Sequence, residues 1–140
     1  MTAGTFDWPV RVYYEDTDAG GVVFYANYLK FMERARTEWL RRAGYSQQQL
    51  IDEGRYLFAV RRAEVDYRRP ARLDDALVVV TAIAVRKRAS LTFEQRVERD
   101  GELLALGRIQ VACLDPANFR PIPLPGHMDA QIEKLMTGAP

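Results

Sequence analysis

Three carboxylates and two glycines lie close together in the run EDTDAGG, which precedes a long amphipathic segment. A helix start offers backbone N–H groups without intrahelical partners, and the helix dipole adds to their preference for negative charge. Acyl transfer requires such donors for the developing oxyanion, together with an oxygen nucleophile or base. Asp18 could supply this oxygen, and the amides around Phe24 and Tyr25 could supply the donors. An ordinary turn before a helix has the same residue pattern, so both interpretations stay open on these residues alone.

The segments on either side of this run decide how it is held. Before it, apolar and polar residues alternate through Val12 and Tyr14, which predicts a half-buried strand that ends near Glu15. After it, from about Phe24, apolar residues recur every three or four positions, which predicts a helix with one buried face that Gly44 ends. That face would hold Tyr28, Phe31, Met32, Ala35, Trp39 and Ala43. The run therefore turns the chain sharply from a strand into a helix.

Other common chemistries lack the residues they need. A serine triad requires Ser, His and a carboxylate, but the serines are Ser46 and Ser90, and the one histidine is His127 in a Pro-rich tail. Cys113 lies in an apolar strand segment, which is typical of a buried structural thiol rather than a nucleophile. One His and one Cys support no metal site, and the sequence indicates no cofactor. These exclusions favour carboxylate chemistry.

Several motifs together resemble one family. The run RVYYEDTDAGGVVFYANY, followed in the helix by ERARTE, is similar to the hallmark of the 4-hydroxybenzoyl-CoA thioesterase family of hotdog-fold proteins. The similarity continues in VDYRRPARLDD, SLTFEQR and CLDP, so it covers almost the whole chain. Within the family, the chain most resembles the tol-pal-associated acyl-CoA thioesterases, the YbgC type.

The resemblance implies roles for particular residues. Asp18 would be the catalytic carboxylate, acting as a nucleophile or as a general base on water, and the backbone N–H of Tyr25 would polarise the thioester carbonyl. Members of this branch often carry His at the position of Tyr25, so help from a His side chain is absent here. We expect Asp16 to serve the turn, Asn27 to cap the helix, and Glu33 to lie on its solvated face.

The remaining patterns place the chain in the α+β class, as a single domain over residues 1–140. The run at 76–85 is apolar throughout, as in a strand covered on both faces, and Asp100-Gly101 is typical of a hairpin turn. The resemblance implies the hotdog fold, in which an antiparallel sheet wraps around a long central helix. Strands are predicted at 58–69, 76–85, 91–97 and 103–114, and short helices near 46–53 and 129–136.

The expected substrate and partners also follow from the resemblance. It implies hydrolysis of acyl-CoA thioesters, with short acyl chains favoured, by a homo-oligomer whose dimers pair into tetramers. Arg86, Lys87 and Arg88 could contact the phosphates of coenzyme A, although a solvated charged turn is the plainer interpretation. The alternatives are an aryl-CoA thioesterase, a non-catalytic module that binds acyl-CoA or acyl carrier protein in an envelope complex, and a scaffold in a tol-pal assembly.

Charge and hydropathy exclude two classes of partner. The chain has 20 basic and 19 acidic side chains, which gives no bulk electrostatic reason to expect nucleic acid or membrane binding. No apolar run approaches the roughly 20 residues that span a bilayer, and residues 1–8 have neither the basic start nor the apolar run of a secretory signal. With one cysteine there is no internal disulfide. We therefore expect a cytoplasmic protein.

Overall fold

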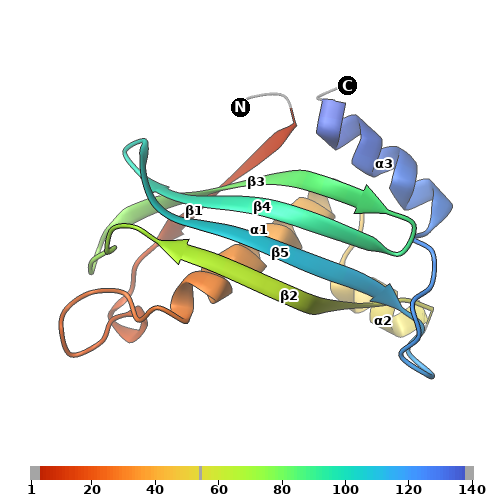
Figure 1. Ribbon diagram of the computed structural model, residues 1–140, viewed down its shortest axis with the longest axis horizontal. Helices are drawn as coiled ribbons and strands as arrows, with labels where there is room; N and C mark the ends of the chain where they lie inside the picture. Colours follow the sequence, from red (N-terminus) through yellow and green to blue (C-terminus); the bar gives the residue numbers. More distant parts are fainter. Residues whose placement is uncertain (1–3, 54, 138–140) are drawn as a thin grey trace.

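The structure is a computed structural model that describes residues 4–53 and 55–137. Its centre is a five-stranded antiparallel sheet in the order β1-β3-β4-β5-β2 (Figure 1). β1 and β2 are therefore the two edge strands. The strands are β1 (Thr5–Arg11), β2 (Leu57–Tyr67), β3 (Ala76–Lys87), β4 (Ser90–Arg99) and β5 (Glu102–Leu114).

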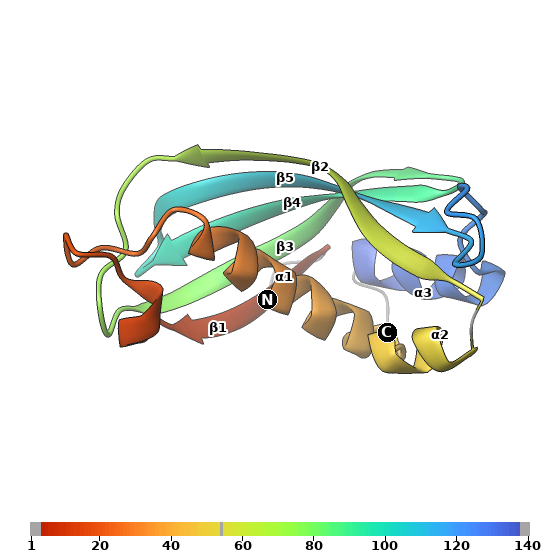
Figure 2. The ribbon, with the colours of Figure 1, turned by 90° about the horizontal axis from the view of Figure 1, so that it is seen from below.

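A long helix, α1 (Asn27–Arg42), lies along the concave face of this sheet (Figure 2). The predicted apolar stripe is confirmed, because all six of its residues are buried. Gly44 follows the helix with φ +97°, a conformation that favours glycine over residues with a side chain. The helix was predicted to begin at about Phe24, three residues before its actual start, because residues 24–26 form a turn that leads into α1.

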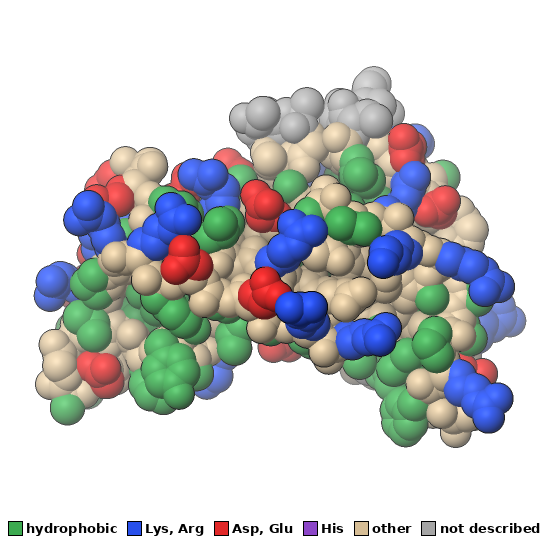
Figure 3. Space-filling view, in the orientation of Figure 1, with side chains coloured by type: hydrophobic (Ala, Val, Ile, Leu, Met, Phe, Trp, Pro, Cys, Tyr) green, Lys and Arg blue, Asp and Glu red, His purple; other side chains and the backbone are tan. Residues whose placement is uncertain are grey.

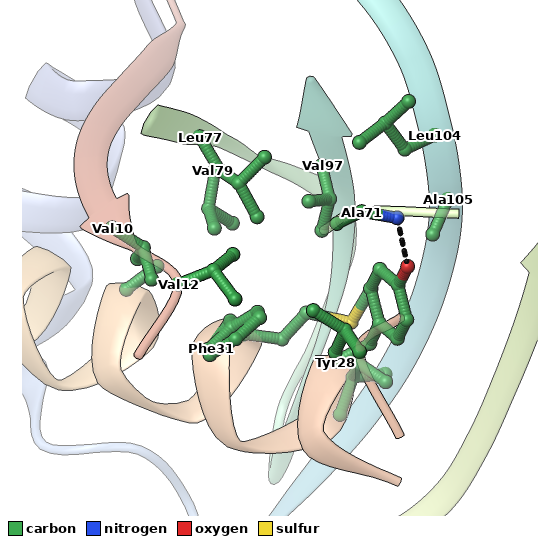
Figure 4. Packing of buried hydrophobic residues seen from close by; sticks show 14 residues of the cluster. Val10, Val12, Tyr28, Phe31, Ala71, Leu77, Val79, Val97, Leu104 and Ala105 are labelled. Atoms are coloured by element: carbon green, nitrogen blue, oxygen red, sulfur yellow. Dashed lines mark hydrogen bonds between the residues drawn. The ribbon is translucent and has the colours of Figure 1, made fainter. Parts of the chain in front are cut away.

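The main core fills the space between α1 and the sheet (Figure 4). Phe31 and Met32 are fully buried there against Val12, Leu77 and other side chains of the strands. The Tyr28 hydroxyl accepts a hydrogen bond from the Ala71 amide at 3.0 Å, the dashed line in Figure 4. A second core cluster, which includes Trp39 and Phe93, lies at the other end of α1.

Two predictions about the strands need correction. β1 ends at Arg11, and Tyr14 begins a 3-10 turn, η1 (Tyr14–Asp16), where its side chain is 82% exposed rather than buried. The turn forms because the Asp16 carboxylate accepts the Tyr13 amide, which draws the chain out of the ladder. The strand at 76–85 is not covered on both faces of this chain, because Val78 and Val80 stay half-buried while their neighbours Leu77 and Val79 are buried.

The other predicted elements are present. Ser46 caps the short helix α2 (Gln47–Glu53), since its hydroxyl accepts the Gln49 amide at 3.1 Å. Asp100 and Gly101 both have positive φ and turn β4 into β5. The last helix, α3 (Gly126–Thr137), packs against the far end of the sheet. None of the helices in the described ranges is both long and apolar enough to cross a membrane.

Candidate active site

Asp16 makes hydrogen bonds to Tyr13, Phe24 and Asn27, which belong to three segments that meet at the start of α1. Its side chain is only 4% exposed, and one carboxylate oxygen accepts the Tyr13 amide at 2.8 Å while the other accepts the Asn27 side-chain amide at 3.1 Å. Its carbonyl oxygen accepts the Phe24 amide at 2.9 Å. The expected turn role of Asp16 agrees with these contacts. The prediction that Asn27 caps the helix is wrong, because Ala26 occupies that position and Asn27 holds Asp16 instead.

The loop after Asp16 presents Asp18 to solvent. The Asp18 amide donates to Val22 at 2.9 Å and the Gly21 amide donates back to Asp18 at 3.0 Å, which closes the predicted tight turn. Gly21 has φ +78°, as this turn requires. One carboxylate oxygen of Asp18 accepts the Gly20 amide at 2.8 Å. The second oxygen has no hydrogen-bond partner in the described chain, so it is available to a ligand.

The backbone N–H of Tyr25 lies just before the start of α1, at the end of the same chain reversal. Tyr25 lies one residue before the N-cap, Ala26, and no described residue accepts its N–H. The Phe24 amide, the other expected donor, is already bonded to Asp16 and is not available. Thr17 and Val23 pair across the loop, so the segment that carries Asp18 and the segment that leads to Tyr25 run side by side. The same chain reversal therefore carries one free carboxylate oxygen, on Asp18, and one free amide donor, on Tyr25.

Tyr67, at the end of β2, holds the backbone of Tyr25 in place. Its hydroxyl donates to the Tyr25 carbonyl at 2.9 Å, and its ring meets the Tyr25 ring edge-on at 6.2 Å. Tyr67 lies in the strand predicted at 58–69 and was given no part in the site, so sequence reasoning missed this contact. A clue was available, since a tyrosine on a half-exposed strand needs a partner for its hydroxyl.

Aromatic side chains surround this end of the molecule. Phe24, Tyr25 and Tyr67 are 44%, 64% and 43% exposed, and the Phe24 and Tyr25 rings lie 4.8 Å apart. Figure 3 shows hydrophobic side chains gathered over the end of the sheet that carries this loop. Such a surface can contact an apolar ligand or a second protein chain.

The basic triplet lies at the opposite end of the sheet in this chain. Arg86 and Lys87 end β3, whose first residue, Ala76, pairs with Arg11 at the end of β1 that precedes the loop, and whose last residue is about 36 Å away along the strand. Arg86 pairs with Glu133 at 2.7 Å and Asp129 at 3.6 Å in α3. The structure therefore places Asp18 and Tyr25 on the same chain reversal and does not bring Arg86, Lys87 or Arg88 to it within one chain.

The other titratable candidates lie away from the loop. Cys113 is fully buried, and burial raises the pKa of its thiol to about 11, so it is protonated at neutral pH. His127 lies in α3, with its ring 5.4 Å from that of Tyr45. Glu33 is exposed on α1, as expected, although it also borders a cavity.

Comparisons with known proteins agree with the fold. The profile of the thioesterase-like superfamily matches residues 12–132. The chain is 45% identical to the acyl-CoA thioesterase YbgC of Haemophilus influenzae, over 96% of this chain and 99% of that one. It is 48% identical to the acyl-CoA thioester hydrolase YbgC of Escherichia coli, over 96% of this chain and 100% of that one.

A crystal structure of a 1,4-dihydroxy-2-naphthoyl-CoA thioesterase from Synechocystis superimposes with a TM-score of 0.89 at 27% identity, covering 94% of this chain and 98% of that one. The predicted family and the predicted sheet wrapped around a helix are both confirmed. The chain belongs to the thioesterase-like superfamily and is a thioesterase with the hotdog fold.

Proposed function

We propose that this chain hydrolyses acyl-CoA thioesters, with Asp18 as the catalytic carboxylate and the Tyr25 amide as the oxyanion donor. The observation that carries the proposal is the pairing, on one loop, of a free carboxylate oxygen with a free backbone N–H at a helix start. The named activity of the YbgC relatives supports the choice of acyl-CoA.

The proposed reaction uses these two groups in sequence. A carboxylate oxygen of Asp18 attacks the thioester carbonyl carbon, or takes a proton from the water that attacks it. The carbonyl oxygen becomes an oxyanion that accepts the Tyr25 N–H, while the positive end of the α1 dipole stabilises the charge. The C–S bond then breaks and the thiolate of coenzyme A leaves. On the covalent route, water finally cleaves the anhydride formed on Asp18 and releases the free acid.

The proposal includes a second copy of the chain. β2 pairs only with β5 in the described chain, which leaves one edge of an 11-residue strand open. A two-fold axis near its middle residue, Arg62, would pair this edge with itself and bring Tyr67 of one copy opposite Leu57 of the other. The site beside Tyr67 would then face the second copy, so the thioester would bind between subunits. This arrangement gives a dimer, and a second contact between dimers would give the tetramer; the 86–88 triplet of another copy would then contact the phosphates.

One observation favours aromatic acyl groups as a second candidate substrate. The exposed rings of Phe24, Tyr25 and Tyr67 offer faces and edges against which an aryl group can pack. The structural relative from Synechocystis acts on an aryl-CoA. Short aliphatic thioesters remain the first choice, and the thiol carrier is proposed to be coenzyme A rather than acyl carrier protein.

The test is thiol release from a panel of short, long and aryl acyl-CoAs and from acyl-carrier-protein thioesters. The wild type is compared with Asp18→Asn, which keeps an oxygen for the Gly20 amide but cannot act as a base or nucleophile. We expect a loss of about 10²- to 10⁴-fold in kcat for Asp18→Asn. Glu15→Gln is the matched control, because Glu15 is an exposed carboxylate three positions away, and it should keep full activity.

A folded Asp18→Asn protein that retains wild-type turnover would refute the assignment of Asp18. Tight binding of acyl-CoA by the wild type without any hydrolysis would instead favour a non-catalytic binding module. A tol-pal scaffold would bind a protein partner, and Asp18→Asn would leave that binding unchanged.

A further inference from the structure

The connection between β2 and β3, residues 68–75, lies beside the loop that carries Asp18. The Asp18 amide donates to the Val22 carbonyl at 2.9 Å, and the next amide along the chain, that of Val23, donates to the Ala71 carbonyl at 2.8 Å. Two successive backbone hydrogen bonds therefore lead from Asp18 to the β2–β3 connection.

Ala71 bonds both to this loop and to α1. It is fully buried, and its carbonyl accepts the Val23 amide while its own amide donates to the Tyr28 hydroxyl at 3.0 Å (Figure 4). Tyr28 lies in the first turn of α1, three residues after Tyr25. The position of the β2–β3 connection therefore sets the spacing between the segment that carries the Asp18 carboxylate and the helix start that carries the Tyr25 amide.

Arg99, the last residue of β4, anchors this connection to the end of the sheet. Its Nη1 donates to the Asp75 carboxylate at 2.7 Å and to the Pro70 carbonyl at 3.3 Å, so it contacts the connection at two points five residues apart. Its Nη2 donates to Glu102 at 3.0 Å, which fixes the guanidinium beside the β4–β5 turn. The same Asp75 oxygen accepts the Arg72 amide at 2.8 Å. Because the side chains of Arg99 and Asp75 are mostly buried, water screens their attraction only in part.

We propose that Arg99 is a positioning residue for the thioesterase reaction, which acts through the β2–β3 connection to hold the Asp18 carboxylate at the reactive distance from the thioester carbonyl. The inference rests on the proposed function, because it requires Asp18 to be the reacting group. In the described chain the hydrogen bonds of Arg99 go to the connection and to Glu102 rather than to the loop, so its effect reaches Asp18 through the backbone. A displacement of about 1 Å at a reacting group can lower the rate about 10²-fold.

The kinetics of thiol release by Arg99→Met test this proposal. Methionine keeps an apolar side chain of similar length but removes the hydrogen bonds to the connection. We expect kcat to fall about 10- to 100-fold while KM changes by less than about threefold, because Arg99 lies outside the groups proposed to bind the thioester. Arg96→Met is the matched control, since Arg96 lies on the same strand and its ion pair, to Glu98 at 2.8 Å, stays within β4. It should keep the wild-type kcat.

Amide hydrogen exchange separates positioning from a general loss of stability. In Arg99→Met the exchange of the Val23 amide should accelerate at least about tenfold more than that of the Cys113 amide, which bonds at the other end of the sheet. A merely structural role would accelerate both amides by the same factor, through global unfolding. In the Asp18→Asn background, Arg99→Met should lower the remaining kcat by less than about threefold, because the group that Arg99 positions is already lost.

If Arg99→Met does not fold, Arg99→Lys decides the question. Lysine keeps the charge, but its compact ammonium lacks the planar fork that contacts Asp75, Pro70 and Glu102, so kcat should fall about three- to tenfold. A folded Arg99 variant with the wild-type kcat, or with equal acceleration of the two amides, would overturn the inference and leave Asp18 as the proposed catalytic group. Full turnover by Asp18→Asn would instead refute the proposed function, and the positioning role with it.

Discussion

The two aspartates of the loop, two positions apart, should separate stability from catalysis. Asp16 is buried and its two oxygens accept hydrogen bonds from Tyr13 and Asn27, whereas Asp18 is exposed and accepts one from Gly20. A hydrogen bond to a charged acceptor contributes about 1.5–3 kcal/mol. The two bonds of Asp16 would total about 3–6 kcal/mol, but the amide of the exposed Tyr13 can bind water once it is released. We therefore expect Asp16→Ala to lower the free energy of unfolding by about 2–4 kcal/mol.

Asp18→Ala should cost less than about 1 kcal/mol, because the Gly20 amide is exposed and water replaces the lost acceptor. Equilibrium unfolding in urea measures both values, at one protein concentration since any oligomer would add a concentration dependence. Thiol release should show the reverse order: Asp18→Ala should be inactive, and Asp16→Ala should keep partial activity at temperatures where it is folded. If the free energies of unfolding of Asp16→Ala and Asp18→Ala agreed within about 1 kcal/mol, the hydrogen bonds of Asp16 would not stabilise the fold as argued here. A stable but fully inactive Asp16→Ala protein would make Asp16 a catalytic candidate.

Three further predictions concern Tyr67, Cys113 and Asp75, which lie outside the loop. Tyr67→Phe removes the hydrogen bond to the Tyr25 carbonyl, so kcat should fall while KM changes little. The fall in kcat should be smaller than the roughly 10²-fold expected for loss of an oxyanion donor. An unchanged kcat would exclude a positioning role for Tyr67. Cys113 should resist iodoacetamide at pH 8 in the folded protein and react in denaturant, because burial raises its thiol pKa to about 11; rapid labelling without denaturant would contradict this. Burial alone would raise the pKa of Asp75, but hydrogen bonds from the Arg72 amide and from Arg99 outweigh it and lower the pKa below the ordinary 3.8. The stabilisation is therefore present above pH 4 and is lost as the pH falls through the folded value, so Asp75→Asn should reduce stability at pH 7 and weaken its decline in acid; parallel stability curves would argue against it.

Much of the fold could be predicted because apolar periodicity directly reports burial. The stripe of α1 and the Asp100-Gly101 hairpin follow from spacing and turn chemistry, and both are confirmed. The end of β1 was misplaced because the carboxylate of Asp16, three positions after Tyr13, accepts the Tyr13 amide and so competes with the strand ladder for the backbone. Periodicity counts apolar side chains and does not include such a competitor. The position of Asp18 followed from its motif, whereas its free oxygen depended on local hydrogen bonds that spacing does not show.

The polar residues of the core were missed although their spacing marks them. Arg36 lies four residues after Met32, on the buried stripe of α1. Gln95 lies between Phe93 and Val97 at the buried positions of β4. A polar residue at a buried period position indicates a partner across the core, because an unpaired buried polar group is costly. Sequence reasoning that looks only for apolar members of each face discards this information.

These polar contacts also explain how α1 can hold a site at its start. Apolar packing is non-directional, so a smooth stripe alone would fix neither the rotation nor the position of the helix along the sheet. Tyr28, Met32 and Arg36, spaced by four residues, each make a hydrogen bond to the sheet side of the core, the first to Ala71 and the other two to Gln95. Hydrogen bonds demand particular distances and angles, so this row specifies one position for α1. The position of the free Tyr25 amide, just before the helix, is therefore set by hydrogen bonds made one, two and three turns further along α1.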